Sequence, residues 1–248
     1  MGSRKRDYSI FNRFEFERQP IGVKFLFKTP EEIKPLNKTL AFCEMFVAAQ
    51  QGEPFYAGKD NHECAGTLPL GMADTEPFFA SGMVGERLGV FEEARAGRRP
   101  YLVLPKLEKG TVNYVAFSPL AKLTFDPDVL IVTATLKQAE ILMRAYSYRT
   151  AKMWSSRFTN VLGCAWLYIY PYLSGEVNYM VTGLCSGGMV ARQILPEALA
   201  LIAIPFDQLP AMMENLENME WFPQEYAVGR DGADDYFRKI TGELSQET

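Results

Sequence analysis

The feature that most constrains the fold is a strand that leads directly into a helix between residues 126 and 148. Residues 129–133 form an unbroken β-rich run that follows the turn signal Asp126-Pro127-Asp128. Residues 136–148 then repeat apolar side chains at helical spacing. A strand followed at once by a helix predicts an α/β unit, in which the helix packs on a sheet.

Other segments extend this pattern along the chain. Proline, glycine and asparagine clusters separate short β-rich runs from amphipathic stretches, and the segments 52–71 and 82–97 are rich in turn signals. The fold class predicted is a single compact α+β or α/β domain with a mixed β-sheet flanked by helices. Strands are predicted at 21–28, 101–104, 113–117, 129–133, 178–181 and 199–204, and helices at 39–51 with Thr39 as the cap, 136–148, 163–173 and 206–219.

The predicted domain spans residues 19–222. Residues 1–18 are expected to form an N-terminal tail or short helix. Residues 223–248 form a polar C-terminal extension, and the tail after Gly242 is expected to fray.

Composition excludes several classes of partner. The 248 residues are 48% hydrophobic and 23% charged with a formal net charge of −4, and no basic stripe indicates nucleic-acid binding. No stretch approaches the roughly 18 consecutive apolar residues of a membrane span, and no signal peptide is evident. A cytoplasmic protein without nucleic-acid or membrane partners is therefore expected, and its oligomeric state stays open.

Four cysteines are dispersed at Cys43, Cys64, Cys164 and Cys185. They are too few for a disulfide scaffold, so thiols or metal ligands are expected in a reducing compartment, with two disulfides as the alternative. Four thiolates match the ligand set of one [4Fe–4S] cluster, although no Cys-x-x-Cys pair is present and the fold must bring them together. The competing interpretation is that Cys43 and Cys164 are small buried hydrophobes of the core.

Cys185 lies in a glycine-rich turn, residues 183–188, between a predicted strand and a predicted helix. A thiolate at a helix N-terminus is stabilised by backbone N–H groups, which makes Cys185 a candidate nucleophile or ligand. The same turn could hold a carboxylate or phosphate, or be a plain turn. The candidate cofactor-binding residues here are Gly183, Ser186, Gly187 and Gly188.

The polar loop 60–66 is the second candidate site, and Asp60 and Gly66 at its ends are candidate cofactor-binding residues. His62 is the only histidine, so a Cys185/His62 dyad is the only Cys–His arrangement the chain allows. His62 and Cys64 could instead bind zinc with Cys185 and another cysteine. A solvated histidine is the plain alternative.

These short blocks together resemble one family. Phe42-Cys43, residues 60–66, residues 127–129 with Gln138-Ala139, Gly163-Cys164 and residues 183–188 recur in this order in the DUF169 family of uncharacterised archaeal and bacterial proteins, over about residues 19–221. Its members are frequent in anaerobes, which is compatible with an oxygen-sensitive cofactor. The resemblance implies no established activity.

The function expected is therefore the binding of a redox or metal cofactor, with a [4Fe–4S] cluster held by the dispersed cysteines as one form. One alternative is a small-molecule binding or accessory protein that holds an anionic ligand without catalysis. Another is a thiol enzyme that uses Cys185. The expected partners are a small-molecule ligand or a redox partner protein.

Overall fold

A mixed seven-stranded β-sheet forms the centre of the molecule in the computed structural model, which describes residues 6–181, 192, 194, 199–223 and 229–247. The strand order is β2-β3-β4-β1-β5-β7-β6, in which β2 and β3 are parallel and the other neighbours are antiparallel. The strands are β1 (Ile21–Leu26), β2 (Lys34–Pro35), β3 (Phe55–Gly58), β4 (Tyr114–Pro119), β5 (Val129–Thr135), β6 (Asn178–Val181) and β7 (Leu199–Pro205).

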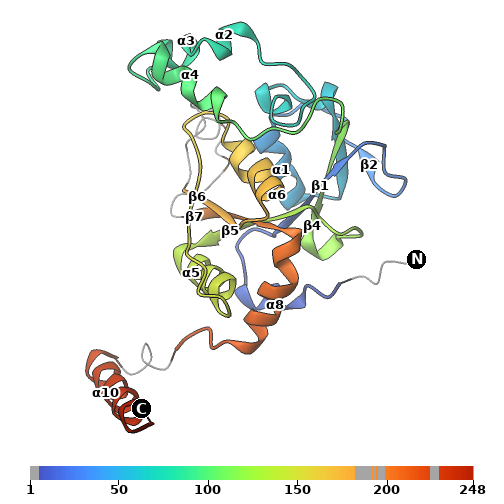
Figure 1. The fold of residues 1–248 in the computed structure, drawn as a ribbon. Helices are drawn as coiled ribbons and strands as arrows, with labels where there is room; N and C mark the ends of the chain where they lie inside the picture. The colour runs from blue at the N-terminus through green and yellow to red at the C-terminus, as the bar shows by residue number, and fades with distance from the viewer. Residues whose placement is uncertain (1–5, 182–191, 193, 195–198, 224–228, 248) are drawn as a thin grey trace.

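Helices cover both faces of this sheet (Figure 1). Helices α1 and α6 lie on one face and α5 and α8 on the other, while α2, α3 and α4 form a separate group beyond α1 and α6. The α-helices are α1 (Phe42–Gln51), α2 (Pro77–Ala80), α3 (Met83–Arg87), α4 (Ala94–Leu102), α5 (Leu136–Ser147), α6 (Tyr170–Ser174), α8 (Leu209–Asn218) and α10 (Gly229–Glu247). Short helical turns are η1 (Ser9–Phe14), η2 (Lys59–Asn61), η3 (Ala65–Thr67), η4 (Leu120–Lys122), η5 (Ala165–Ile169, π-helical) and η6 (Phe206–Gln208).

The central strand β5 divides the core into two clusters. Val129 and Ile131 pack on the face that carries α1 and η5, whereas Leu130 and Val132 pack against α5 and α8. Successive side chains of a strand point to opposite faces, and both faces of this sheet are covered. This is why residues 129–133 read as a continuous apolar run, and the predicted α+β domain with a mixed sheet flanked by helices is confirmed.

The start of α1 differs from the prediction. Ala41, and not Thr39, is the N-cap residue, because the carboxylate of Glu44 reaches back and accepts the backbone N–H of Ala41 at 2.9 Å. The third helical residue therefore makes one half of a capping box, in which its side chain accepts the N–H of the cap residue. This contact fixes the first turn of α1, against which the candidate site is built.

Most predicted elements are present, and three differences stand out. Residues 101–104 were predicted as a strand, but residues 101 and 102 complete α4, in which exposed and buried positions alternate at helical spacing. Strand β3 lies inside the turn-rich segment 52–71. Its four residues are too few for an alternating apolar pattern that would predict a strand. Helix α10 continues past Gly242, where fraying was expected.

In the described part of the chain, no helix has the length and apolarity needed to cross a membrane.

Candidate functional site

The sulfur of Cys64 lies at the N-terminal end of α1. Its Sγ accepts the backbone N–H of Phe42, the first residue of α1, at 3.3 Å and that of Gly66 at 3.3 Å. The positive end of the helix dipole and two N–H donors stabilise negative charge on an acceptor atom. Cys64 is half-buried and packs against the hydrophobic core cluster. Its sulfur therefore has two N–H donors close by and apolar side chains around it.

Backbone hydrogen bonds hold the loop 60–66 against the chain that enters α1. Leu40 donates its N–H to the carbonyl of Asn61 at 2.8 Å, and Glu63 donates to the carbonyl of Leu40 at 3.1 Å. The Asn61 side chain adds bonds to the carbonyls of Leu36 and Lys38. The position of Cys64 is therefore fixed by the fold.

Gly66 permits this close approach. A Cβ atom at this buried position would lie 2.6 Å from Cβ of Phe42 and 3.2 Å from the Cys64 sulfur. Carbon atoms in contact need about 3.5–4.0 Å, so a side chain here would push the loop away from α1. Gly66 thus acts by its lack of a side chain.

Tyr168 occupies the centre of the site. It comes from the π-helical turn η5, is 1% exposed, and stacks on Phe42 with the ring centroids 4.3 Å apart. Its hydroxyl has no hydrogen-bond partner among the described residues. A buried polar group without a partner is uncommon, which marks this hydroxyl as a point where a ligand could be bound.

Three cysteines belong to, or pack against, the core cluster of this tyrosine. The pKa of Tyr168 lies well above its ordinary value of 10.0, first because burial disfavours the phenolate and then because Cys43, Cys164 and Cys64 oppose its negative charge. Cys164 is buried and precedes Tyr168 by four residues, while Cys43 and Cys64 are half-buried and pack against the same core cluster. The fold therefore gathers three of the four dispersed cysteines.

His62 lies beside the same cluster. Its ring packs edge-on against Phe42 with the centroids 5.3 Å apart, and neither ring nitrogen has a partner in the described structure. Burial lowers the pKa of His62 from 6.5 to about 4, so the imidazole is neutral at neutral pH. A neutral imidazole offers one donor and one acceptor nitrogen to a ligand.

The acidic residues of the loop do not join this cluster. Asp60 and Glu63 are exposed, so neither is placed to act as a buried acid or base. Glu44, on the first turn of α1, forms an ion pair with Arg192 at 3.5 Å. Arg192, which lies 148 positions after Glu44 in the sequence, is thus brought to the N-terminal end of α1, where the sulfur of Cys64 also lies.

The candidate residues of the glycine-rich turn lie outside the described residues. These are Gly183, Cys185, Ser186, Gly187 and Gly188, so the predicted Cys185/His62 dyad and the fourth metal ligand stay predictions. Within the described ranges, no group of three or more His, Cys, Asp or Glu side chains could hold a metal ion as it stands. Any metal site at these cysteines would need a further ligand or a movement of the thiols.

Sequence reasoning named every cysteine but did not identify the role of Tyr168. The available signal was its spacing of four residues from Cys164 in an apolar helix, which places both on one side. No spacing in the sequence indicates the ion pair of Arg192 with Glu44, because the two residues are far apart along the chain.

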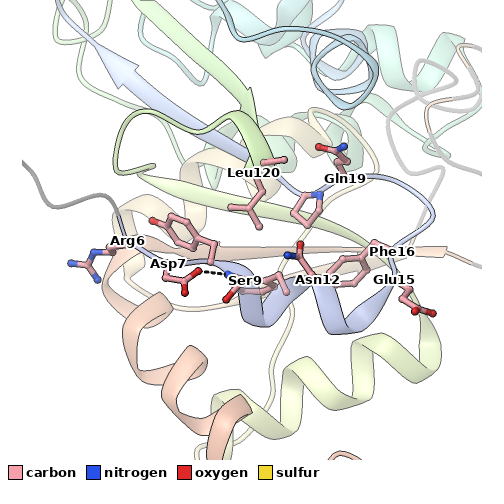
Figure 2. A pocket seen from close by; sticks show the side chains of 12 residues that line it. Arg6, Asp7, Ser9, Asn12, Glu15, Phe16, Gln19 and Leu120 are labelled. Carbon is pink, nitrogen blue, oxygen red and sulfur yellow. Dashed lines mark hydrogen bonds between the residues drawn. The ribbon is translucent and has the colours of Figure 1, made fainter.

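A separate hollow lies at the N-terminal segment (Figure 2). It has a volume of about 500 Å³, and its walls come from residues 6–20 together with Leu120 and Ala121. Asp7 accepts the backbone N–H of Ser9 there at 2.8 Å. Cys43, Cys64, Cys164, His62 and Tyr168 are not among the described residues that line it, so it is distinct from the thiol cluster.

The chain was compared with known proteins. A family model described as DUF169, uncharacterised ArCR, matches residues 10–215. Neither the search of curated proteins nor that of solved structures found a match.

Proposed function

The chain belongs to the DUF169 family, and from the site itself we propose that the protein binds a redox or metal cofactor through its dispersed cysteines. An iron–sulfur cluster of the [4Fe–4S] type is the form proposed. The observation that carries the proposal is that Cys43, Cys64 and Cys164 all belong to, or pack against, the core cluster of Tyr168, whose buried hydroxyl has no partner among the described residues. Cys185 is proposed as the fourth ligand on its sequence alone.

The environment of Cys64 supports this assignment. Thiolates are the ligands of iron–sulfur clusters, and hydrogen bonds to the sulfurs help to set their reduction potential. The N–H groups of Phe42 and Gly66 are donors of this kind. The apolar packing of Phe42 and Tyr168 would limit the access of water to the cofactor.

The cellular setting proposed is the cytoplasm. Its reducing conditions keep thiols available for a metal or cluster. The chain has no other histidine that could replace His62 as a nitrogen ligand. A zinc site would therefore depend on His62 together with Cys64, whereas an all-cysteine cluster would not.

The test is purification under strict exclusion of oxygen, followed by visible spectroscopy and analysis of iron, sulfide and zinc. The proposal predicts a broad visible absorption and roughly four irons and four sulfides per chain. Cys43→Ser, Cys64→Ser, Cys164→Ser and Cys185→Ser should each lower the bound iron.

His62→Ala serves as the matched control. It should keep the iron of an all-cysteine cluster but lose the metal of a His–Cys zinc site. Circular dichroism would verify that each variant is folded. A colourless, metal-free protein that takes up neither iron nor zinc on reconstitution would overturn the proposal.

A second candidate function, a thiol enzyme, is favoured by the two N–H donors on the Cys64 sulfur. These contacts make Cys64 a candidate nucleophile alongside Cys185. Selective, fast alkylation of one of these cysteines near neutral pH would support this function. Equally slow labelling of all four cysteines would exclude it.

A further inference from the structure

Helices α2, α3 and α4 form a group that lies beyond α1 and α6 and away from the central sheet (Figure 1). The group carries several large apolar side chains in exposed positions. Exposed apolar side chains gathered in one small region can mark an interaction surface. They are Phe78, Met83, Leu88, Leu102 and Val103.

Helix α4 presents three arginines on one stripe. Arg95, Arg98 and Arg99 are all exposed, and their spacing of three and four residues places them on the same helix face. Leu102 continues the stripe one turn further and is 71% exposed. The face therefore combines three positive charges with an apolar end.

None of these three guanidinium groups has a partner in the described part of the chain. Arg95, Arg98 and Arg99 form no hydrogen bond, ion pair or ring contact with a described residue, although the chain has more acidic than basic residues. Like charges three and four residues apart disfavour a helix. An anion from outside the chain that contacts the stripe would relieve this repulsion.

The opposite face of α4 is held in place. Gly97 and Pro100 are buried, and Tyr101 packs against the same core cluster as Cys43 and Cys64. The backbone of α4 touches that of the turn before α3, since a Cβ at Gly97 would lie 2.4 Å from the carbonyl oxygen of Gly82. The packed side of α4 fixes the helix face on which the arginines lie, so the helix backbone itself has little freedom to lose on binding.

We propose that the arginine stripe of α4 is a docking surface for a partner protein with an acidic surface. Arginine is enriched at protein interfaces because its planar group pairs with carboxylates through two hydrogen bonds. Leu102 at the end of the stripe supplies an apolar contact next to the charges. The proposal concerns the outer face of α4 and stands whether or not the thiol cluster binds a cofactor.

The probes are two fluorescent peptides, one of glutamate alone and one in which glutamates alternate with leucines. Binding is measured by fluorescence anisotropy at low and at physiological salt. Wild-type protein should bind both peptides and bind them less tightly at higher salt. The triple variant Arg95→Glu, Arg98→Glu and Arg99→Glu should lose roughly tenfold to a hundredfold in affinity.

A matched control separates this surface from general electrostatics. The triple variant Lys28→Glu, Lys34→Glu and Lys38→Glu has the same net charge and alters exposed positions near β1 and β2. It should keep the wild-type affinity. An equal loss in both triple variants would overturn the assignment to α4.

Leu102→Ser tests the apolar end of the stripe. It should weaken the binding of the alternating peptide and leave the binding of the all-glutamate peptide unchanged. Phosphatidylserine vesicles and single-stranded RNA are measured in parallel. The proposal is overturned if neither peptide binds, or if vesicles or RNA bind through these arginines more tightly than the peptides do.

Discussion

At the scale of single residues, the site is defined by buried polar atoms that have no partners in the described structure. They are the hydroxyl of Tyr168 and both ring nitrogens of His62, and the rings of both residues pack on Phe42. Leaving such an atom without a hydrogen bond costs about 1–3 kcal/mol. Three of them in one cluster are accounted for if a cofactor or ligand supplies the missing bonds.

Removal of the Tyr168 hydroxyl should stabilise the cofactor-free protein. Tyr168→Phe deletes a buried polar atom that makes no hydrogen bond to a described residue, so the free energy of unfolding should rise by about 1 kcal/mol. Urea denaturation measures it. The comparison variant Tyr170→Phe removes a hydroxyl that donates to Glu176 at 3.1 Å and should give a small loss. A loss for Tyr168→Phe as large as that for Tyr170→Phe would show that the hydroxyl is already bonded.

The neutral state of His62 predicts a pH dependence of stability. The unfolded chain binds a proton at a pKa of 6.5 and the folded chain at about 4, so the unfolded state binds more protons between these values. Stability should be full above pH 6.5 and fall as the pH drops toward 4, by at most about 3 kcal/mol.

The variant His62→Leu isolates this contribution. Carboxylates titrate in the same range in both proteins, and their effect cancels in the difference between wild type and variant. The fall in unfolding free energy from pH 7 to pH 4.5 should therefore be smaller in His62→Leu than in wild type. Identical pH dependence of the two proteins would contradict a buried neutral histidine.

At the scale of elements, the site depends on how the loop 60–66 is held against the start of α1. The loop is fixed by backbone bonds around Leu40, and its last residue, Gly66, packs directly on Phe42. Helix α1 is fixed in turn by the contact of Glu44 with Ala41. The position of the Cys64 sulfur thus depends on two contacts, that of Gly66 with Phe42 and that of Glu44 with Ala41.

Gly66→Ala should destabilise the fold through this contact. The new Cβ would lie 2.6 Å from Cβ of Phe42, so the loop must shift, at a cost of roughly 1–3 kcal/mol. Chemical denaturation measures the loss. Gly242→Ala is the control, because a Cβ there meets no atom within 4 Å and alanine favours helix α10. Equal stability of the two variants would show that Gly66 is not needed for close packing.

Sequence patterns predicted the elements that bury apolar faces and missed those defined by tertiary contacts. Strand β5 and helix α5 were recognisable because their apolar periodicity is long and begins at a clear turn and cap. Strand β3 is four residues long and borders glycine, so its pairing with β4 decides its structure. Residues 101 and 102, predicted as the start of a strand, instead complete α4, a helix whose Gly97 packs closely on Gly82.

At the scale of the whole molecule, the sheet separates two cores, and the candidate site belongs to only one of them. Cys43 comes from α1, Cys64 from the loop before η3 and Cys164 from the segment before η5. Their gathering depends on both α1 and η5 packing on the same face of the sheet. The four cysteines could be named from the sequence as candidates, but this convergence could not, since no local spacing encodes it.

The most direct test of the cofactor proposal is native mass spectrometry of protein purified without oxygen. The account predicts a mass above that of the 28.0 kDa polypeptide by one cofactor, and its loss in Cys64→Ser. A mass equal to the bare polypeptide, even after supply of iron and sulfide, would contradict it.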